Sequence, residues 1–331
     1  MRWGLAGAST IAAEHMIGAF RVCGGEIAWV MSASADHAAD YAAKHWINRS
    51  GTDLDALLSA PDVDAVYISS TNEKHLPQAM AAIAAGKHVL CEKPLAMNSV
   101  DARSMVAAAA AKGVVFATNH HLRNAGSHMA IRELIAQGTI GDVLSVRVHH
   151  AVHLPPHLQG WRIKDKAAGG GVIADITVHD ADTVRFHLDE APVEVVAMAT
   201  SSGMGEGVED SCMSIWSMPS GAQVFAHESF THANAGSGIE VHGTKGSVFG
   251  RGVMTQRPVG TVELVTVDGR TDVPFSAHNL YEQAVKFFMD AVSGNGRPAA
   301  DGSDGVKSLA IAGAVKAAAE TGARTAVRYA S

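Results

Sequence analysis

The chain has 331 residues, of which 47% are hydrophobic, and this length favours two domains over a single core. Acidic residues number 33 and basic residues 26, and the net charge of −7 argues against electrostatic binding to nucleic acid or to an anionic membrane. The three cysteines fall outside any Cys-x-x-Cys pattern, and neither a signal peptide nor an uncharged stretch of membrane length is recognisable, so we expect an unexported protein in a reducing cytoplasm.

Short β-like runs alternate with alanine-rich helical segments in the first third of the chain, as in βαβ units that build a parallel sheet. The expected strands are residues 2–7, 26–32, 64–70, 88–91 and 114–118. The expected helices are residues 11–22, 35–45, 74–85 and 99–112, and Gly86 and Gly113 stand where helix-ending residues are favoured. Residues 1–119 are therefore predicted to form an α/β, doubly wound Rossmann domain that binds a dinucleotide.

The pattern changes beyond Asn119 to one that is rich in strands. After a helical stretch near 125–137, most of 143–153 and 193–275 is strand-like, with turns at Ser220-Gly221, Gly243-Thr244 and Asp268-Gly269. Residues 278–293 and 304–319 are expected to be closing helices. We therefore predict a second domain over residues 120–331.

The turn after the first expected strand lies where a dinucleotide fold places its glycine-rich loop, so that helix amides meet the pyrophosphate. Its three fingerprint positions hold Gly7, Ser9 and Ala12, and only the first of these is glycine. The place in the chain thus supports a dinucleotide site more strongly than the motif does. An ordinary tight turn is the alternative.

The end of the second expected strand bears on the choice between NAD and NADP. An acidic residue there would bind the ribose 2′-hydroxyl of NAD and repel a 2′-phosphate, but this chain has Ser32-Ala33-Ser34. Hydroxyls can donate to a phosphate, and His37 could add partial positive charge, so the sequence favours NADP. A polar loop that selects neither cofactor is the alternative.

Two motifs resemble the signatures of one oxidoreductase family. Glu92-Lys93-Pro94 follows the fifth expected strand, and Gly169-Gly170-Gly171 leads through Asp175 to His179. Their order and spacing resemble the glucose–fructose oxidoreductase, inositol dehydrogenase and rhizopine catabolism (Gfo/Idh/MocA) family, in which the second motif carries the catalytic histidine.

The resemblance covers the whole chain and has consequences for the second domain. It implies an α+β domain with an open, mostly antiparallel mixed sheet that supplies the pocket for a small-molecule sugar substrate. In this family the sheet is often an oligomer interface, so either a monomer or a homo-oligomer formed through the sheet is expected.

Within that family the chain is most similar to an NADP-dependent sugar reductase, in the segments 7–12, 118–124, 157–162 and 279–282. The likeness implies NADP(H) contacts from the following residues: Gly7, Ala8, Ser9, Thr10, Ile11, Ser32, Ala33, His37, Ser70, Thr71, Asn72, Glu73, Lys74, His75, Glu92, Lys93, Asn119, Trp161, Arg162 and Tyr281. His37 departs from the pattern, because an arginine that grips the 2′-phosphate is expected there. Histidine is mostly neutral at pH 7, so we expect weaker discrimination against NAD.

Hydride delivery to a ketone builds negative charge on its oxygen, so the site needs a cation or donor and an acid. Lys93 is suited to polarise the carbonyl and His179 to exchange the proton. Asp175 lies four residues before His179, so on a helix the two share one face, and the carboxylate could orient the imidazole or contact substrate hydroxyls. We therefore predict an NADP-dependent oxidoreductase acting on CH–OH groups, with Lys93, His179 and Asp175 as catalytic residues. A solvated loop lysine and a surface Asp/His pair are the alternatives.

Four further histidines, His149, His150, His153 and His157, invite comparison with a metal site. No cysteine or carboxylate completes a ligand set, and Pro155-Pro156 excludes a continuing helix, so no metal is predicted. His150, His153 and His157 are candidates for a polar sugar pocket, with surface loop histidines as the equal alternative.

Two other functions stay open on the sequence. One is another sugar or inositol dehydrogenase of the same family, since substrate choice is expected to lie in variable loops near 150–162 and 228–240. The other is a non-catalytic NADP-binding redox sensor, against which the presence of both Lys93 and His179 argues.

Overall fold

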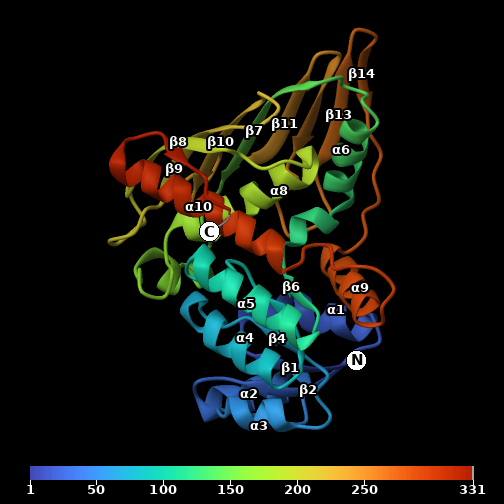
Figure 1. Cartoon of the computed structure of the whole chain (residues 1–331), viewed down its shortest axis with the longest axis vertical. Coiled ribbons are helices and arrows are strands. Elements are labelled where there is room, and N and C mark those ends of the chain that lie inside the picture. The colour runs from blue at the N-terminus through green and yellow to red at the C-terminus, as the bar shows by residue number, and fades with distance from the viewer. Residues whose placement is uncertain (330–331) are drawn as a thin grey trace. The chain divides into compact units, whose positions relative to one another are not determined.

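Within residues 1–329, the part of the chain that this computed structural model describes, six parallel strands form one sheet in the order β3-β2-β1-β4-β5-β6 (Figure 1). The strands are β1 (Arg2–Ala6), β2 (Glu26–Met31), β3 (Ser50–Gly51), β4 (Ala65–Ile68), β5 (His88–Cys91) and β6 (Phe116–Thr118). The strand order reverses between β1 and β4. Doubly wound sheets bind their ligands at the carboxyl ends of the strands beside such a reversal.

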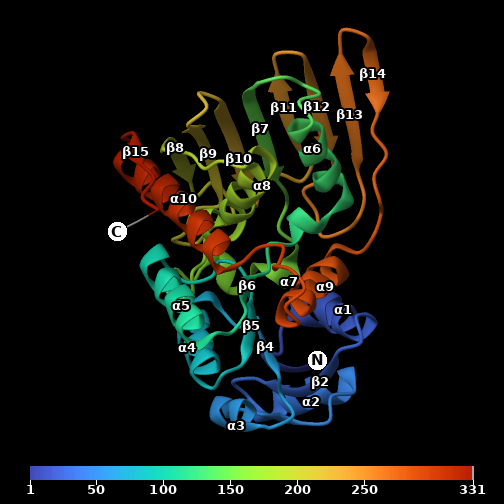
Figure 2. The same cartoon turned by 45° about the vertical axis from the view of Figure 1, so that its right-hand side comes forward.

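Helices lie on both sides of this sheet, with α4 and α5 on one side and α1 and α9 on the other (Figure 2). The helices are η1 (Ala12–Met16), α1 (Ile17–Val22), α2 (Ala35–His45), α3 (Leu54–Ser59), η2 (Asn72–Lys74), α4 (His75–Ala84), α5 (Ser99–Lys112) and α9 (Leu280–Val292). The strands and helices expected before residue 119 are confirmed, each to within two residues at either end. β3 and α3 were not predicted from the sequence, because β3 has only two residues and α3 only six. Asp53 was a signal for α3, since it caps this helix by accepting from Asp55 N–H at 2.9 Å.

Contacts group residues 281–306 with residues 1–120 in one unit, and residues 121–280 with those from 307 onward in a second. In the first unit, Trp3 of β1 is fully buried, stacks on Phe20 of α1 at 4.1 Å and lies 5.2 Å from Phe288 of α9, measured between ring centroids. The division expected from the sequence, at residue 119, differs from this grouping in residues 281–306. The helical pattern of that segment does not indicate which distant strand it covers.

The sheet of the second unit has nine strands in the described part of the chain, in the order β14-β13-β12-β11-β7-β10-β9-β8-β15. They are β7 (Val143–Ala151), β8 (Glu194–Thr200), β9 (Ser211–Ser217), β10 (Gln223–Ser229), β11 (Ser237–Gly243), β12 (Gly246–Arg251), β13 (Thr261–Thr266), β14 (Gly269–Asp272) and β15 (Thr325–Ala326). β7 and β10 pair in parallel, and the other neighbouring pairs are antiparallel. The predicted fold class is confirmed: an α/β Rossmann domain and an α+β domain with an open, mostly antiparallel mixed sheet.

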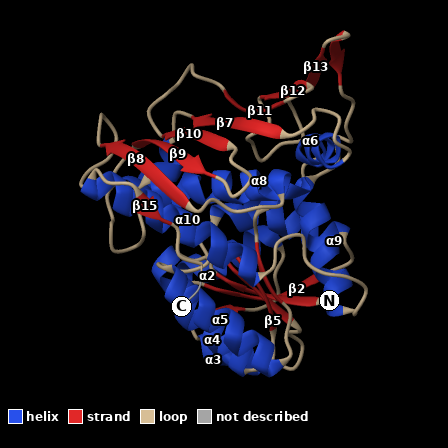
Figure 3. Cartoon of the chain, turned by 45° about the horizontal axis from the view of Figure 1, so that its top comes forward, coloured by secondary structure: helices blue, strands red, loops and turns tan. Residues whose placement is uncertain are grey.

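Helices cover one face of this second sheet (Figure 3). They are α6 (Gly126–Ala136), α8 (Val178–Leu188) and the part of α10 (Gly302–Thr321) from Lys307 on. The second unit also contains shorter helical segments: η3 (His121–Asn124), α7 (Pro156–Gln159), η4 (Gly160–Ile163) and η5 (Ile173–Thr177). The core lies between these helices and the sheet, and it includes Val146 of β7, Val224 of β10 and Ile311 of α10. The outer face keeps several apolar side chains exposed: Val196, Met198, Met213, Ile215 and Phe225. No helix among residues 1–329 combines the length and the apolar character of a membrane-spanning segment.

Candidate functional site

Predicted cofactor residues follow five of the six strands in the first unit. Gly7 follows β1, Ser32 follows β2, Ser70 lies just after β4, Glu92 follows β5 and Asn119 follows β6. Because parallel strands end at one edge of their sheet, the fold brings these segments to the same edge. Trp161, Arg162, Asp175 and His179 belong to the second unit.

The loop after β1 packs directly on the end of β4. Gly7 has φ +124°, and a Cβ there would lie 2.8 Å from Ser70 N, so only glycine fits without displacing backbone. Gly7 N–H donates to Met31 O at 3.0 Å, and Ser9 Oγ donates to Ser69 Oγ at 2.7 Å. The loop is therefore fixed to two neighbouring strands before η1 begins. Its position suits backbone recognition of a pyrophosphate.

The segment after β2 offers hydroxyl and imidazole groups at the surface. Ser32 Oγ lies 2.9 Å from His37 Nδ1, and Ser34 caps α2 by accepting from His37 N–H at 3.3 Å. Ala33 and His37 are exposed. These groups and the amino end of α2 could hold a phosphate, whereas Asp36 in the first turn of α2 acts against one.

The segment after β4 contains both exposed and buried predicted residues. Glu73 and Lys74 are exposed, whereas Asn72 is buried and His75 is fully buried. The ring of His75 lies between two backbone carbonyls, with Nδ1 2.8 Å from Pro94 O and Nε2 3.2 Å from Ser70 O. Burial lowers the pKa of His75. His75 thus joins two loops of the site rather than presenting its ring at the surface. Two hydroxyls are also held nearby: Ser70 Oγ donates to Gln78 Oε1 at 2.7 Å, and Thr71 Oγ1 to Glu73 Oε1 at 2.6 Å.

Glu92 joins the ends of three strands. Its Oε1 accepts from Tyr67 OH at 2.5 Å and from Asn119 Nδ2 at 2.7 Å, and Asn119 N–H donates to Cys91 O at 2.8 Å. Burial raises the pKa of the Glu92 carboxyl, and the hydrogen bonds from Tyr67 and Asn119 act in the opposite direction. The backbone of Lys93 therefore leaves β5 from a fixed point. The Lys93–Pro94 peptide is cis.

The last predicted cofactor residue of the first unit, Tyr281, comes from α9. It is buried and stacks on His15 of η1 at 4.5 Å between ring centroids. This contact places Tyr281 against the helix that follows the glycine loop.

In the second unit, consecutive glycines allow a close approach of the turn that carries Trp161 and Arg162. A Cβ on Gly170 would lie 2.7 Å from Trp161 O, and Gly171, with φ +114°, donates its N–H to Arg162 O at 2.9 Å. Arg162 Nε lies 3.5 Å from Asp175 Oδ2, and its Cζ lies 4.7 Å from the Trp161 ring centroid. The structure thus brings Trp161, Arg162 and Asp175 together.

His179 lies in the first turn of α8, directly after the π-helical turn η5 that contains Asp175. It is 6% exposed, and its ring centroid lies 4.8 Å from that of His121 and 6.3 Å from that of His150. His150 is buried, and its Nδ1 lies 2.9 Å from Asp180 Oδ1. The other members of the histidine cluster differ: His149 is half-buried, and His153 and His157 are exposed. Residues 1–329 contain no group of three or more histidine, cysteine or acidic side chains placed to hold a metal ion.

Sequence reasoning did not select His121, which lies beside His179, or Asp180 and Glu228, which lie beside His150. His121 belongs to the segment 118–124, and Asp180 directly follows His179 in the chain. Glu228 faces the core in β10, after Val224 and Ala226, and an acid at an inward position of such an alternation was a signal that could have found it.

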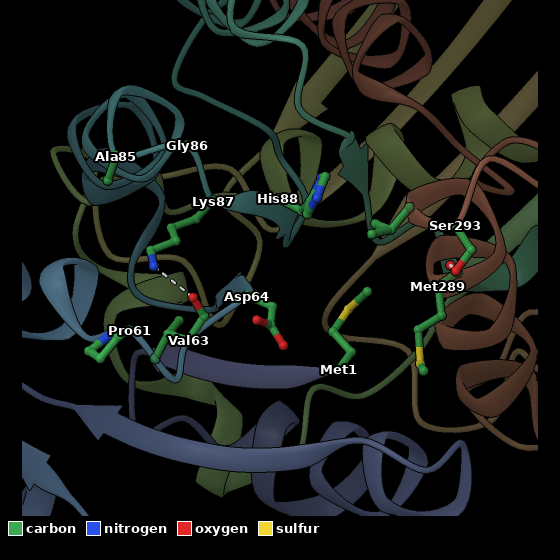
Figure 4. Close-up of a pocket in the computed structure, with 11 residues that line it drawn as sticks. Met1, Pro61, Val63, Asp64, Ala85, Gly86, Lys87, His88, Met289 and Ser293 are labelled. Carbon is green, nitrogen blue, oxygen red and sulfur yellow. Dashed lines mark hydrogen bonds between the residues drawn. The ribbon is translucent and has the colours of Figure 1, made fainter.

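A cavity of about 600 Å³ lies at the opposite, amino ends of the strands in the first unit (Figure 4). Met1, Asp64, Lys87 and His88 are among its lining residues, and none of the predicted site residues is. Lys87 Nζ donates to Val63 O at 2.7 Å, and Asp64 pairs with Arg2 at 2.6 Å. Because these charged groups already have partners, the cavity is not the candidate site.

Two family models match the chain. One, described as an oxidoreductase family with an NAD-binding Rossmann fold, covers residues 1–120, and the other, the GFO/IDH/MocA C-terminal domain, covers residues 128–249.

Curated proteins and solved structures are also similar. The chain is 56% identical over 322 residues to the 1,5-anhydro-D-fructose reductase of Ensifer adhaerens, covering 97% of each chain. It is 31% identical over 280 residues to the inositol 2-dehydrogenase of Rhizobium meliloti (strain 1021), covering 81% of this chain and 82% of that one. The aldose-aldose oxidoreductase from Caulobacter crescentus, solved with glycerol, has a similar fold, with a TM-score of 0.91 and 23% identity over 98% of this chain and 99% of that one.

We expect Gly7→Ala to weaken binding of NADP(H) or NAD(H) on the order of 10-fold or more, because the new methyl group would displace the loop from Ser70. Calorimetric titration measures the affinity. Gly18→Ala is the matched control, since Gly18 lies in α1 with nothing within 4 Å of a Cβ, and it should raise the free energy of unfolding by roughly 0.5–1 kcal/mol at unchanged affinity. Equal affinities in the two variants would show that the loop does not contact the cofactor.

Proposed function

The chain belongs to the GFO/IDH/MocA oxidoreductase family, and we propose that it uses NADPH to reduce 1,5-anhydro-D-fructose to 1,5-anhydro-D-mannitol. The observation that carries this proposal is the 56% identity to a 1,5-anhydro-D-fructose reductase over 97% of both chains. The lower identity of 31% to an inositol 2-dehydrogenase makes inositol oxidation the second candidate.

The groups after β2 support the choice of NADPH over NADH. No carboxylate stands at the end of β2, and the Ser32 hydroxyl and the His37 ring, 2.9 Å apart, are there to receive a 2′-phosphate. Both cofactors contain the pyrophosphate that the Gly7 loop would bind. The selectivity therefore depends on Ser32 and His37.

The reaction needs one hydride and one proton. NADPH, when bound, supplies the hydride to the ketone carbon. Lys93 stabilises the negative charge that develops on the ketone oxygen, and His179 donates the proton that completes the alcohol. Asp175, which Arg162 contacts at 3.5 Å, orients His179 or binds a substrate hydroxyl. An alcohol and NADP⁺ are the products.

In this proposal, cofactor binding is mainly assigned to the first unit and sugar binding to the second. Residues 1–119 bind the cofactor together with segment 281–306, Trp161 and Arg162, and other residues of 120–331 bind the sugar. A monomer and a homo-oligomer formed through the exposed sheet face that carries Met198, Met213 and Phe225 both stay open.

The proposal is tested by following NADPH oxidation with a panel of ketoses that includes 1,5-anhydro-D-fructose. We expect turnover with that substrate, and NMR of the product should identify 1,5-anhydro-D-mannitol rather than its C2 epimer. Oxidation of myo-inositol with NAD⁺ as the only measurable activity would favour the second candidate. Tight NADPH binding without turnover of any ketose or inositol would favour a redox sensor.

We expect a higher kcat/KM with NADPH than with NADH, and Ser32→Asp should move that ratio toward NADH by roughly 10-fold, because the carboxylate repels the 2′-phosphate. Steady-state kinetics with both cofactors measure the ratio. Ser34→Asp is the matched control: it adds the same charge and preserves the cap of α2, so its effect should be smaller. A wild-type enzyme that prefers NADH would contradict the assignment of Ser32.

Lys93→Met and His179→Ala should each lower kcat by about 10²-fold or more, because each removes a group that acts mainly on the transition state. NADPH affinity, measured by fluorescence titration, should stay within about threefold of wild type. Lys112→Met removes a charge from an exposed lysine at the end of α5 and should leave kcat unchanged. Normal turnover in either site variant would assign that residue a structural role.

A further inference from the structure

One carboxylate organises the loop between β8 and β9, residues 201–210. Asp210, the last residue of this loop, has 0% exposure. Its two oxygens accept from four successive backbone N–H groups at 2.7–3.0 Å, those of Ser202, Gly203, Met204 and Gly205. Ser202 Oγ also donates to Asp210 Oδ1 at 3.0 Å. The backbone of the loop is therefore wrapped around a single side chain.

Asp210 carries a negative charge in this arrangement. Burial raises the pKa of its carboxyl group, but the hydrogen bonds from the backbone N–H groups outweigh that effect and lower the pKa to about 2. An ionised carboxyl group has only acceptor sites, so it can satisfy several donors at once. The shape of the loop thus depends on one buried anion.

The loop contacts η4, the turn that contains Arg162. Glu206 N–H donates to the carbonyl oxygen of Ile163 at 2.7 Å, and Ile163 directly follows Arg162 in the chain. Gly205, whose N–H donates to Asp210 at 2.9 Å, directly precedes Glu206. Neighbouring peptide groups of the loop are therefore bonded to the carboxylate and to η4. A loop without its carboxylate would loosen this attachment of η4.

The same loop is attached to the glycine motif and to the start of η5. Val172 N–H donates to Glu209 O at 2.9 Å, and Ile173 N–H donates to Glu209 Oε1 at 3.3 Å. A Cβ on Gly171 would lie 2.4 Å from Glu209 Oε1, so the carboxyl group of Glu209 occupies the space that a side chain would need. Asp175 N–H donates in turn to Gly171 O at 3.1 Å. The segment that carries Asp175 is therefore fixed where it begins.

The two attachments converge on one ion pair of the predicted site. Glu206 holds the turn that contains Arg162, and Glu209 holds the segment that leads to Asp175. Arg162 Nε lies 3.5 Å from Asp175 Oδ2. Both partners of this pair thus depend on a loop that is some 30 residues further along the chain.

We propose that Asp210 and Glu209 are positioning residues, through which the loop 201–210 holds Arg162 against Asp175 for contact with the cofactor and the sugar. This inference rests on the proposed function, in which Arg162 contacts NADPH and Asp175 orients His179 or binds a substrate hydroxyl. It adds the loop 201–210 to the segments near 150–162 and 228–240 on which substrate choice was expected to depend.

Kinetics of Asp210 variants test this role. Asp210→Ala removes the acceptor, so KM for 1,5-anhydro-D-fructose and Kd for NADPH should each rise on the order of 5- to 10-fold. The kcat at saturation should change by less than about threefold, because Lys93 and His179 are not held by this loop. Asp210→Asn keeps one acceptor oxygen and should give values between those of the wild type and Asp210→Ala.

Limited proteolysis reports on the same loop without any substrate. Arg162, Lys164 and Lys166 are trypsin sites in the segment that the loop holds. Cleavage at these sites, identified by mass spectrometry, should be on the order of 10-fold faster in Asp210→Ala, because the segment opens more often. Faster cleavage at unchanged KM and unchanged NADPH affinity would show that the segment is not part of the site, and would overturn the proposal.

Two controls separate this role from loss of charge and from loss of stability. Asp268→Ala removes an exposed acid from the turn between β13 and β14 and should leave KM and cleavage unchanged. Val241→Ala, in the core side of β11, should lower thermal stability without raising KM. If Asp210→Ala raises KM no more than Val241→Ala does, Asp210 contributes only to overall stability and the positioning role is wrong.

A double-mutant cycle tests whether Asp210 acts through Arg162. Arg162→Ala alone should raise Kd for NADPH, and the addition of Asp210→Ala should raise it little further, because the group that the loop holds is already absent. Additive effects of the two substitutions would show that Asp210 acts elsewhere, and the proposal would then be wrong.

Two substitutions at Glu209 test the second attachment. Glu209→Gln keeps an acceptor for Ile173 N–H and should retain a nearly wild-type KM. Glu209→Leu fills the same space without an acceptor and should raise KM roughly as Asp210→Ala does. Equal KM values in the two Glu209 variants would rule out a role for the hydrogen bond to η5.

Failure of this inference and failure of the proposed function give different results. Faster cleavage and weaker NADPH binding in Asp210→Ala, without turnover of 1,5-anhydro-D-fructose by the wild type, would contradict the proposed substrate and support the role of the loop. Turnover of that ketose by the wild type, with unchanged KM, NADPH affinity and cleavage in Asp210→Ala, would overturn this inference alone.

Discussion

A carboxyl group removed from water needs a donor, a counter-charge or a proton, and both units of this protein meet that requirement beside their predicted catalytic residues. In the first unit, Glu92 receives hydrogen bonds from Tyr67 and Asn119 and so joins the ends of β4, β5 and β6. In the second, the buried carboxyl of Asp180 has its Oδ1 2.9 Å from Nδ1 of His150. In each case the solution fixes the backbone or ring of a neighbouring functional residue.

Close backbone approach is the other constraint that both units share. Gly7 lets the first loop touch the end of β4, and Gly170 lets the segment before η5 touch the turn that holds Trp161. Side chains at these positions would separate segments that the site needs together. The glycines of the two motifs therefore have a packing role in addition to any contact with a ligand.

Local patterns account for what could be predicted from the sequence. The alternation of apolar strands with alanine-rich helices gave the strands of the first sheet to within two residues, because that pattern is repeated over short distances along the chain. The motifs around Lys93 and His179 were found because they are contiguous. The grouping of α9 with Trp3 and the meeting of His150, Asp180 and Glu228 could not be read in this way, because each depends on packing between segments far apart in the sequence.

Because the first unit combines residues 1–120 with residues 281–306, its folding cannot be completed early in synthesis. Its core contains Phe288, which leaves the ribosome only after the whole sheet of the second unit except β15 has been synthesised. Until then Trp3 lacks one of its two aromatic neighbours, and the nascent dinucleotide domain exposes apolar surface. The second unit also waits for its last segment, since Ile311 and Val315 of α10 belong to its core. The two units thus reach their complete cores within the same last stretch of translation, and neither is finished long before the other.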